Sequence, residues 1–165
     1  MLTRASNNDI IIVEVILMEN IIVYCDGGCR GNQSDENVGG YGIVLQYKGY
    51  IKEIYKGERN TTNNQQELKG AIVALESIKT TNIPVIIHCD SAYVINGMNQ
   101  WVKGWKKNGW TKKGGEIKNL DLWKRLDELA SKQSNLVFQK VKGHSTNEGN
   151  NRADELANKA MDEVE

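Results

Sequence analysis

Ile-Ile-Val-Tyr-Cys-Asp-Gly-Gly, residues 21–28, is the stretch that decides the fold. Its first five residues are apolar and mostly β-branched, which predicts a buried strand that ends at Asp26. A second apolar run, residues 85–89, ends in the same way at Asp90. If these two strands are parallel neighbours, both carboxylates emerge at the same edge of the sheet, where α/β proteins gather their ligand sites.

The chain on either side of this stretch alternates between strand and helix patterns. Residues 26–40 are rich in Gly, Asn and Asp and predict a loop, and Lys48-Gly49 predicts the turn of an antiparallel hairpin. Further strands are predicted at 41–47, 50–55 and 136–141, and helices at 63–79, 91–98, 120–130 and 151–161. This order indicates the α/β class, with a mixed sheet, helices packed on its faces and right-handed crossovers.

Length and composition indicate one globular domain. The chain has 165 residues, of which 39% are hydrophobic, and its formal net charge is zero, so bulk charge indicates no partner. Three cysteines are too few for a disulfide scaffold and favour free thiols in a reducing compartment. The apolar run 10–18 is too short to span a bilayer and lacks the features of a signal peptide. We expect a cytoplasmic protein with an N-terminal extension, residues 1–17, outside a catalytic domain of residues 18–165.

Two further acids fall on helix faces that a core should cover. Glu67 shares a helical stripe with Ala71 and Leu75, and Asp154 shares one with Ala157. Each acid has a structural alternative. Asp26 could start a turn, and Asp90 could cap the helix that follows it. Asp154 could stabilise the positive end of its helix dipole, and Glu67 could complete a capping box whose N-cap is Asn64.

Taken together, the four acids predict a metal site. Carboxylates in one place repel each other and raise each other's proton affinity, and a hard divalent cation removes that cost. An oxygen-only ligand set favours Mg²⁺ or Mn²⁺. A zinc site built from Cys25, Cys29, Cys89 and His88 would have poor spacing.

At this point an ordered set of motifs resembles bacterial type 1 ribonuclease H, the ribonuclease HI family. The strings are YCDGGCRGN (24–32), GGYG (39–42), TTNNQQEL (61–68), AIVALE (71–76), CDSAYV (89–94), residues 100–110 and 118–126, VKGH (141–144) and NRADELA (151–157). The resemblance covers residues 18–162. It implies a five-stranded mixed sheet whose first three strands are antiparallel.

The resemblance also implies an activity and a set of site residues. The family hydrolyses the RNA strand of RNA–DNA hybrids without sequence specificity by a two-metal-ion mechanism, leaving 5′-phosphate and 3′-hydroxyl ends. The four metal-binding carboxylates of the family match Asp26, Glu67, Asp90 and Asp154, and its loop histidine matches His144. Contacts with the hybrid match Asn32, Asn63 and Asn64, and contacts with the DNA-strand phosphate match Thr62 and Ser91.

The chain departs from the family pattern in its first loop and at its N-terminus. The family often has Asn-Pro where this chain has Asn32-Gln33, and the loop that follows is longer here. Gly28 replaces the usual serine, and the extension 1–17 is unlike the simplest members. These differences concern hybrid contacts in the loop rather than the metal site.

Residues 101–118 hold six lysines and one acid, interleaved with tryptophans and glycines. This pattern predicts a projecting basic arm whose lysines displace counterions from phosphates. The candidate contacts are Trp101, Lys103, Lys106, Lys107 and Trp110. Alternatively, the lysines form a solvated helix face, and the tryptophans pack the base of the arm.

The expected partner is an RNA–DNA hybrid, bound by a monomer that needs two Mg²⁺ ions and no membrane. Two other functions remain open from the sequence. One is a resolvase-like or integrase-like nuclease on the same fold, and the other is a non-catalytic module that binds hybrids. A cleavage assay that compares RNA–DNA hybrid with DNA–DNA and RNA–RNA duplexes would distinguish the resolvase-like or integrase-like nuclease. Binding of the hybrid without metal-dependent cutting would indicate the non-catalytic module.

Overall fold

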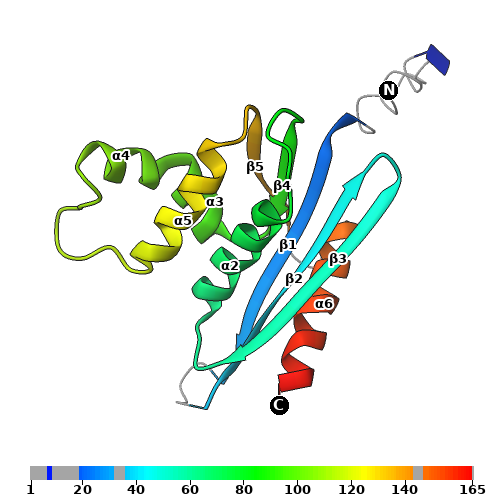
Figure 1. Cartoon of the computed structure of the whole chain (residues 1–165). Helices are drawn as coiled ribbons and strands as arrows, with labels where there is room; N and C mark the ends of the chain where they lie inside the picture. The colour runs from blue at the N-terminus through cyan, green and yellow to red at the C-terminus, as the bar shows by residue number, and fades with distance from the viewer. Residues whose placement is uncertain (1–6, 9–18, 32–35, 143–146, 165) are drawn as a thin grey trace, which may run out of the picture.

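A computed structural model describes residues 7–8, 19–31, 36–142 and 147–164. Its centre is a five-stranded sheet with the strand order β3-β2-β1-β4-β5 (Figure 1). The strands β1 (Ile21–Arg30), β2 (Val38–Tyr47) and β3 (Tyr50–Arg59) pair antiparallel. The strands β4 (Val85–Cys89) and β5 (Leu136–Lys140) run parallel to β1. The predicted mixed sheet is therefore confirmed.

The hairpin between β2 and β3 has the turn that the sequence predicted. Lys48 and Gly49 both have positive φ, 48° and 81°. When both residues of a two-residue turn have positive φ angles, the twist of the turn matches the right-handed twist of the flanking strands. Tyr47 therefore pairs directly with Tyr50.

The predicted loop over residues 26–40 is wrong at both of its ends. β1 continues through Asp26 to Arg30, and β2 already begins at Val38. Glycines in the sequence indicated a loop, but here they lie inside paired strands, with Gly28 opposite Gly40. A strand glycine marks a place where another segment approaches closely.

The helices differ from the predicted ranges mainly at their ends. They are α2 (Asn63–Glu76), α3 (Ala92–Asn96), the π-helical segment η1 (Gly97–Trp101), α4 (Val102–Lys107), α5 (Leu120–Ser131) and α6 (Glu148–Val164). The helix predicted over 63–79 ends three residues early, at Glu76. The helix predicted over 91–98 is a short α3 that leads into η1, and α6 is longer than predicted at both ends.

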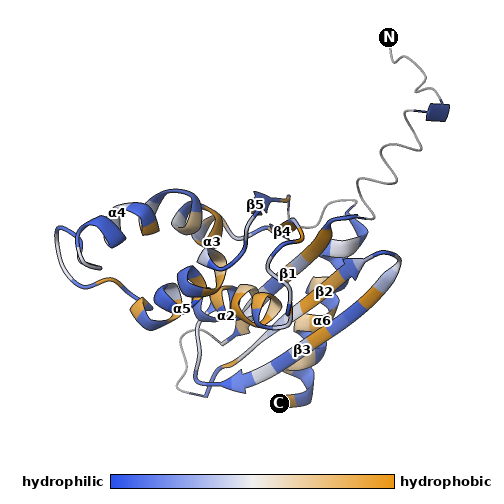
Figure 2. Cartoon of the chain, turned by 45° about the horizontal axis from the view of Figure 1, so that its top comes forward, coloured by the Kyte–Doolittle hydropathy of each residue, from blue (hydrophilic) through white to orange (hydrophobic). Residues whose placement is uncertain are grey.

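Helices cover both faces of the sheet, as predicted. α2 packs on β1 and β2 and against α5, whereas α6 crosses β1, β2 and β3 on the other face (Figure 1). The larger core lies on the α2 side and is centred on buried Leu68, Ile87 and Trp123. Figure 2 shows this division, with hydrophobic residues along β1, β2 and α2 and a largely hydrophilic α4. No described helix is long and apolar enough to cross a membrane.

Candidate active site

Two acids lie side by side because of the register between β1 and β4. The parallel pairing of these strands ends at Tyr24 and His88. Asp26 and Asp90 each follow two residues later, so both carboxylates lie at one edge, as predicted. Asp26 does not end its strand, however, because β1 goes on to pair with β2, where Asp26 lies opposite Gly42.

Glu67 reaches the same place from α2. The backbone N–H of Gly27 donates to Asp26 Oδ1 at 3.0 Å and to Glu67 Oε1 at 3.1 Å, which links the helix to β1. The capping-box alternative for Glu67 is wrong. The N-cap is Thr62, not Asn64, and the Thr62 side chain accepts from the N–H of Gln65.

Asp26, Glu67 and Asp90 form a compact cluster. One carboxylate oxygen from each lies within 4.8 Å of the others. Asp26 is only 7% exposed. Glu67 Oε2 is buried and has no hydrogen-bond partner in the described part of the chain. An all-oxygen donor set with an unpartnered buried oxygen fits a hard divalent cation.

The electrostatics of the cluster also favour the binding of a cation. Burial, the charge of Asp90 and the side chain of Asp154 raise the pKa of Asp26 to about 8, although a hydrogen bond with Glu67 acts in the opposite direction. Burial and the charges of Asp26 and Asp90 raise the pKa of Glu67 well above its ordinary value. Without a cation, the cluster therefore retains protons at neutral pH.

Asp154 lies beside the cluster rather than in its centre. It is half-buried on α6, and its side chain raises the pKa of Asp26 through a hydrogen bond and through its charge. It is not one of the three residues whose oxygens lie within 4.8 Å of each other. The structure thus brings three of the four predicted ligands together and places the fourth against Asp26.

Four of the predicted substrate-contact residues, Thr62, Asn63, Asn64 and Ser91, lie within five residues of Glu67 or Asp90 in the chain. Asn63 and Asn64 are exposed in the first turn of α2, directly after Thr62. Ser91 is the N-cap of α3, where its hydroxyl accepts from the N–H of Val94 at 3.2 Å. Asn32 and His144 lie outside the described residues.

The predicted basic arm begins at η1 and α4. Lys103 and Lys107 are exposed on α4, whereas Lys106 pairs with Asp127 at 3.1 Å. Tryptophan rings pack the base of the arm, as the sequence analysis allowed. The rings of Trp101 and Trp105 lie 6.3 Å and 5.7 Å from that of Trp123. Trp110 is half-buried, with Lys124 Nζ 5.9 Å from its ring centre.

A cavity between the arm and α2 is lined in part by residues that were not among the predicted substrate contacts. Its volume is about 360 Å³, and its lining includes Tyr93, Lys112 and Lys118 as well as Asn64 and Trp101. The two lysines were in the basic stretch, so charge alone could have indicated them. Tyr93 carried no such signal. Its hydroxyl accepts from Trp123 Nε1 at 3.1 Å, which joins α3 to α5.

The cysteines do not form a metal site. Cys25 and Cys89 are buried in the core, and Cys29 is partly buried. Among the described residues, the only group of three potential ligands within reach of one ion is the carboxylate cluster.

The fold and the cluster together define a class, the α/β proteins whose mixed sheet carries a cluster of carboxylates that could hold a metal ion. Comparison with known proteins then identifies the family. The family model for RNase H matches residues 18–162. The chain belongs to the ribonuclease H family.

Curated relatives match over almost their whole length. The chain is 51% identical over 148 residues to ribonuclease H of Clostridium botulinum, which covers 88% of this chain and 98% of the relative. It is 48% identical to ribonuclease H of Ruthia magnifica, over 89% of this chain and 99% of the relative.

Solved structures agree with the fold. LC9-RNase H1, described as a type 1 RNase H with the type 2 active-site motif, matches with a TM-score of 0.78 and 33% identity, over 88% of this chain and 74% of that one. LC11-RNase H1, solved in complex with an RNA/DNA hybrid, matches with a TM-score of 0.67 and 29% identity, over 88% of this chain and 99% of that one.

Proposed function

We propose that this protein is a metal-dependent endonuclease that hydrolyses the RNA strand of RNA–DNA hybrids. The observation that carries the proposal is the cluster of Asp26, Glu67 and Asp90, whose oxygens converge within 4.8 Å in a chain of the ribonuclease H family. The complex of LC11-RNase H1 with a hybrid supports the choice of substrate. The products carry 5′-phosphate and 3′-hydroxyl ends.

We assign Asp26, Glu67, Asp90 and Asp154 as the ligands of two Mg²⁺ ions, with Mn²⁺ as a possible substitute. When bound, such ions activate a water for attack on phosphorus and stabilise the leaving oxygen. The chain itself supplies the rigid frame. The Gly27 N–H fixes Asp26 and Glu67 relative to each other, and the β1–β4 register fixes Asp90 beside them.

The hybrid lies across the cluster between α2 and the basic arm. Lysines such as Lys103 and Lys107 neutralise backbone phosphates, which makes binding depend on salt but not on sequence. Asn63 and Asn64 are placed to read the 2′-hydroxyl groups of the shallow minor groove. His144 moves a proton or assists release of the product phosphate.

The proposed catalytic unit is residues 18–165, and residues 1–17 form an extension outside it. The RNase H match over residues 18–162 supports this boundary. The proposal also has the protein act as a monomer, and the assembly of the described cluster within a single chain supports it. Its free cysteines favour the reducing cytoplasm.

A substrate panel tests the proposal. RNA–DNA hybrid, DNA duplex and RNA duplex of one sequence are incubated with the protein, with and without Mg²⁺. Cutting of the RNA strand of the hybrid alone, and only with Mg²⁺, is expected. The variant Asp90→Asn should lose this activity, and Asp121→Asn, an exposed acid on α5, should retain it. Cutting of DNA duplexes would favour a resolvase-like enzyme, and binding without cutting would favour a non-catalytic module.

A further inference from the structure

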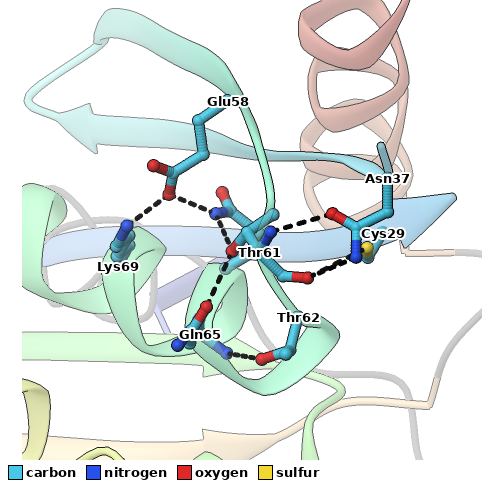
Figure 3. A network of polar contacts seen from close by, with 8 residues as sticks. Cys29, Asn37, Glu58, Thr61, Thr62, Gln65 and Lys69 are labelled. Carbon is cyan, nitrogen blue, oxygen red and sulfur yellow. Dashed lines mark hydrogen bonds and ion pairs between the residues drawn. The ribbon is translucent and has the colours of Figure 1, made fainter. Parts of the chain in front are cut away.

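A buried polar network holds the connection between β3 and α2 (Figure 3). At its centre, Asn37 and Thr61 are 9% and 4% exposed. The N–H of Thr61 donates to Asn37 Oδ1 at 2.8 Å, and Asn37 Nδ2 donates to the Thr61 carbonyl at 2.8 Å. The Asn37 side chain therefore pairs with Thr61 as a neighbouring strand would. The N–H of Asn60 adds a bond to the Asn37 carbonyl at 3.0 Å.

The same network continues into the first two turns of α2. The Thr61 hydroxyl accepts from Gln66 Nε2 at 2.8 Å and donates to Gln65 Oε1 at 3.1 Å. Gln66 is fully buried and also donates to Glu58 on β3 at 2.6 Å, and Glu58 is paired with Lys69. Thr61 thus has every polar group bonded. Among the described residues, the oxygen of Gln66 is the one buried side-chain atom of this network without a partner. Breaking the buried bonds of Thr61 is costly, because each donor or acceptor left behind would be unsatisfied.

This network lies directly beside the residues assigned to the hybrid. Thr62, Asn63 and Asn64 follow Thr61 in the chain and are all exposed. At the other end, Gln66 precedes Glu67 of the acid cluster. The network therefore sets where the exposed first turn of α2 lies relative to the cluster.

We propose that Asn37 is a positioning residue for substrate binding, which acts by holding Thr61 and thereby the hybrid-contacting turn Thr62–Asn64. This inference rests on the proposed function. Among the described residues, Asn37 makes its hydrogen bonds to Asn60 and Thr61 and none to the acids. The Gly27 N–H and the β1–β4 register hold the acids independently. Loss of Asn37 should accordingly weaken hybrid binding and leave the chemical step largely intact.

The test compares Asn37→Ala and the milder Asn37→Ser with the wild-type full chain. The control is Leu129→Ala on α5, which removes a partly buried core contact outside the network. Three quantities are measured for each protein. They are KM and kcat on an RNA–DNA hybrid of fixed length, the Kd for that hybrid without divalent metal by fluorescence anisotropy, and the thermal midpoint.

For Asn37→Ala we expect KM and Kd to rise about tenfold, since two hydrogen bonds to the backbone are lost. For Asn37→Ser we expect about a threefold rise, because a hydroxyl can replace one of the two bonds. The kcat should stay within about twofold of wild type, and Leu129→Ala should lower the midpoint with KM and Kd unchanged. If Asn37→Ala does not fold, Asn37→Ser decides the question.

Two results would overturn the positioning role. One is an unchanged KM and Kd in a folded Asn37 variant, and the other is an equal rise in Leu129→Ala, which would indicate general destabilisation. A wild-type protein that binds the hybrid but never cuts it would refute the hydrolysis, while the Kd values would still decide the role of Asn37. A wild-type protein that does not bind the hybrid would refute both.

Discussion

Replacing Asp26 by asparagine should make the metal-free protein more stable at neutral pH while it abolishes Mg²⁺-dependent cutting. The pKa of Asp26 is raised from 3.8 to about 8 by burial and by its acidic neighbours. The folded protein therefore binds this proton more tightly than the unfolded chain does. Its stability is greatest below the unfolded pKa near 4 and falls as the pH rises towards 8, where the loss is complete.

The size of the effect follows from this shift. At pH 7 the stability lost through Asp26 has an upper limit of about 4 kcal/mol, at 1.36 kcal/mol per pKa unit. Asparagine removes the titration and keeps an oxygen that can accept from the Gly27 N–H, but it also buries an amide. We expect about half of the limit, roughly 2 kcal/mol, which raises the melting midpoint of a domain of this size by roughly 4–8 °C.

Thermal melts in a chelating buffer at pH 4 and pH 7 measure this difference. Asp26→Asn should exceed wild type at pH 7, and the gap should largely close at pH 4, because this pH lies close to the unfolded pKa of 3.8 and little of the stability linked to the Asp26 proton has been lost there. Asp121→Asn serves as the control, and it should show no gain over wild type at pH 7, because an acid in the first turn of α5 is itself stabilising. If Asp26→Asn is no more stable than wild type at pH 7, repulsion and burial in the cluster do not act as described.

Three further results are expected. Adding Mg²⁺ should raise the melting midpoint of wild type more at pH 8 than at pH 5, because protons compete with the ion for the carboxylates. Lys103→Ala and Lys107→Ala should each lower the slope of log K against log salt for hybrid binding by about 1, whereas Lys132→Ala, at the far end of α5, should not. Gly97→Ala should reduce stability in urea unfolding by about 2 kcal/mol, because a Cβ there would overlap the ring of Trp123.

The sequence predicted the sheet because periodicity and turn chemistry are local. Three local patterns each predicted a single structure, and all three are confirmed: the strand at 21–25, the Lys48-Gly49 turn and the strand after Pro84. The extent of β1 could not be predicted in the same way. Whether residues 26–30 form a loop or a strand depends on what packs against Gly27 and Gly28. Those partners, α2 and Met161 of α6, come later in the chain.

The acids of the site were also predictable, but their surroundings were not. Asp26 and Asp90 follow apolar strands, and Glu67 falls on a buried stripe, so each position violates the pattern around it. The Gly27 N–H that joins Asp26 to Glu67 is a backbone group. Because every residue except proline has a backbone N–H, the residue type could not indicate which of them bonds to the acids. Similarly, Asn37 looked like one more polar loop residue.

The acid cluster and the Asn37 network show two opposite ways to bury polar groups on the same helix. At Glu67 the chain leaves an oxygen without a partner and accepts repulsion between neighbouring acids, so this site lowers stability until a cation binds. One residue earlier, the amide nitrogen of Gln66 donates to Thr61 and Glu58, so this side chain ties the first turns of α2 to β3 although its own oxygen, among the described residues, also lacks a partner. Glu67 is tied to β1 instead, through the bond that its Oε1 accepts from the Gly27 N–H. Two separate anchors thus hold neighbouring residues of α2, which is why the loss of Asn37 should affect the exposed turn of the helix and not the acids.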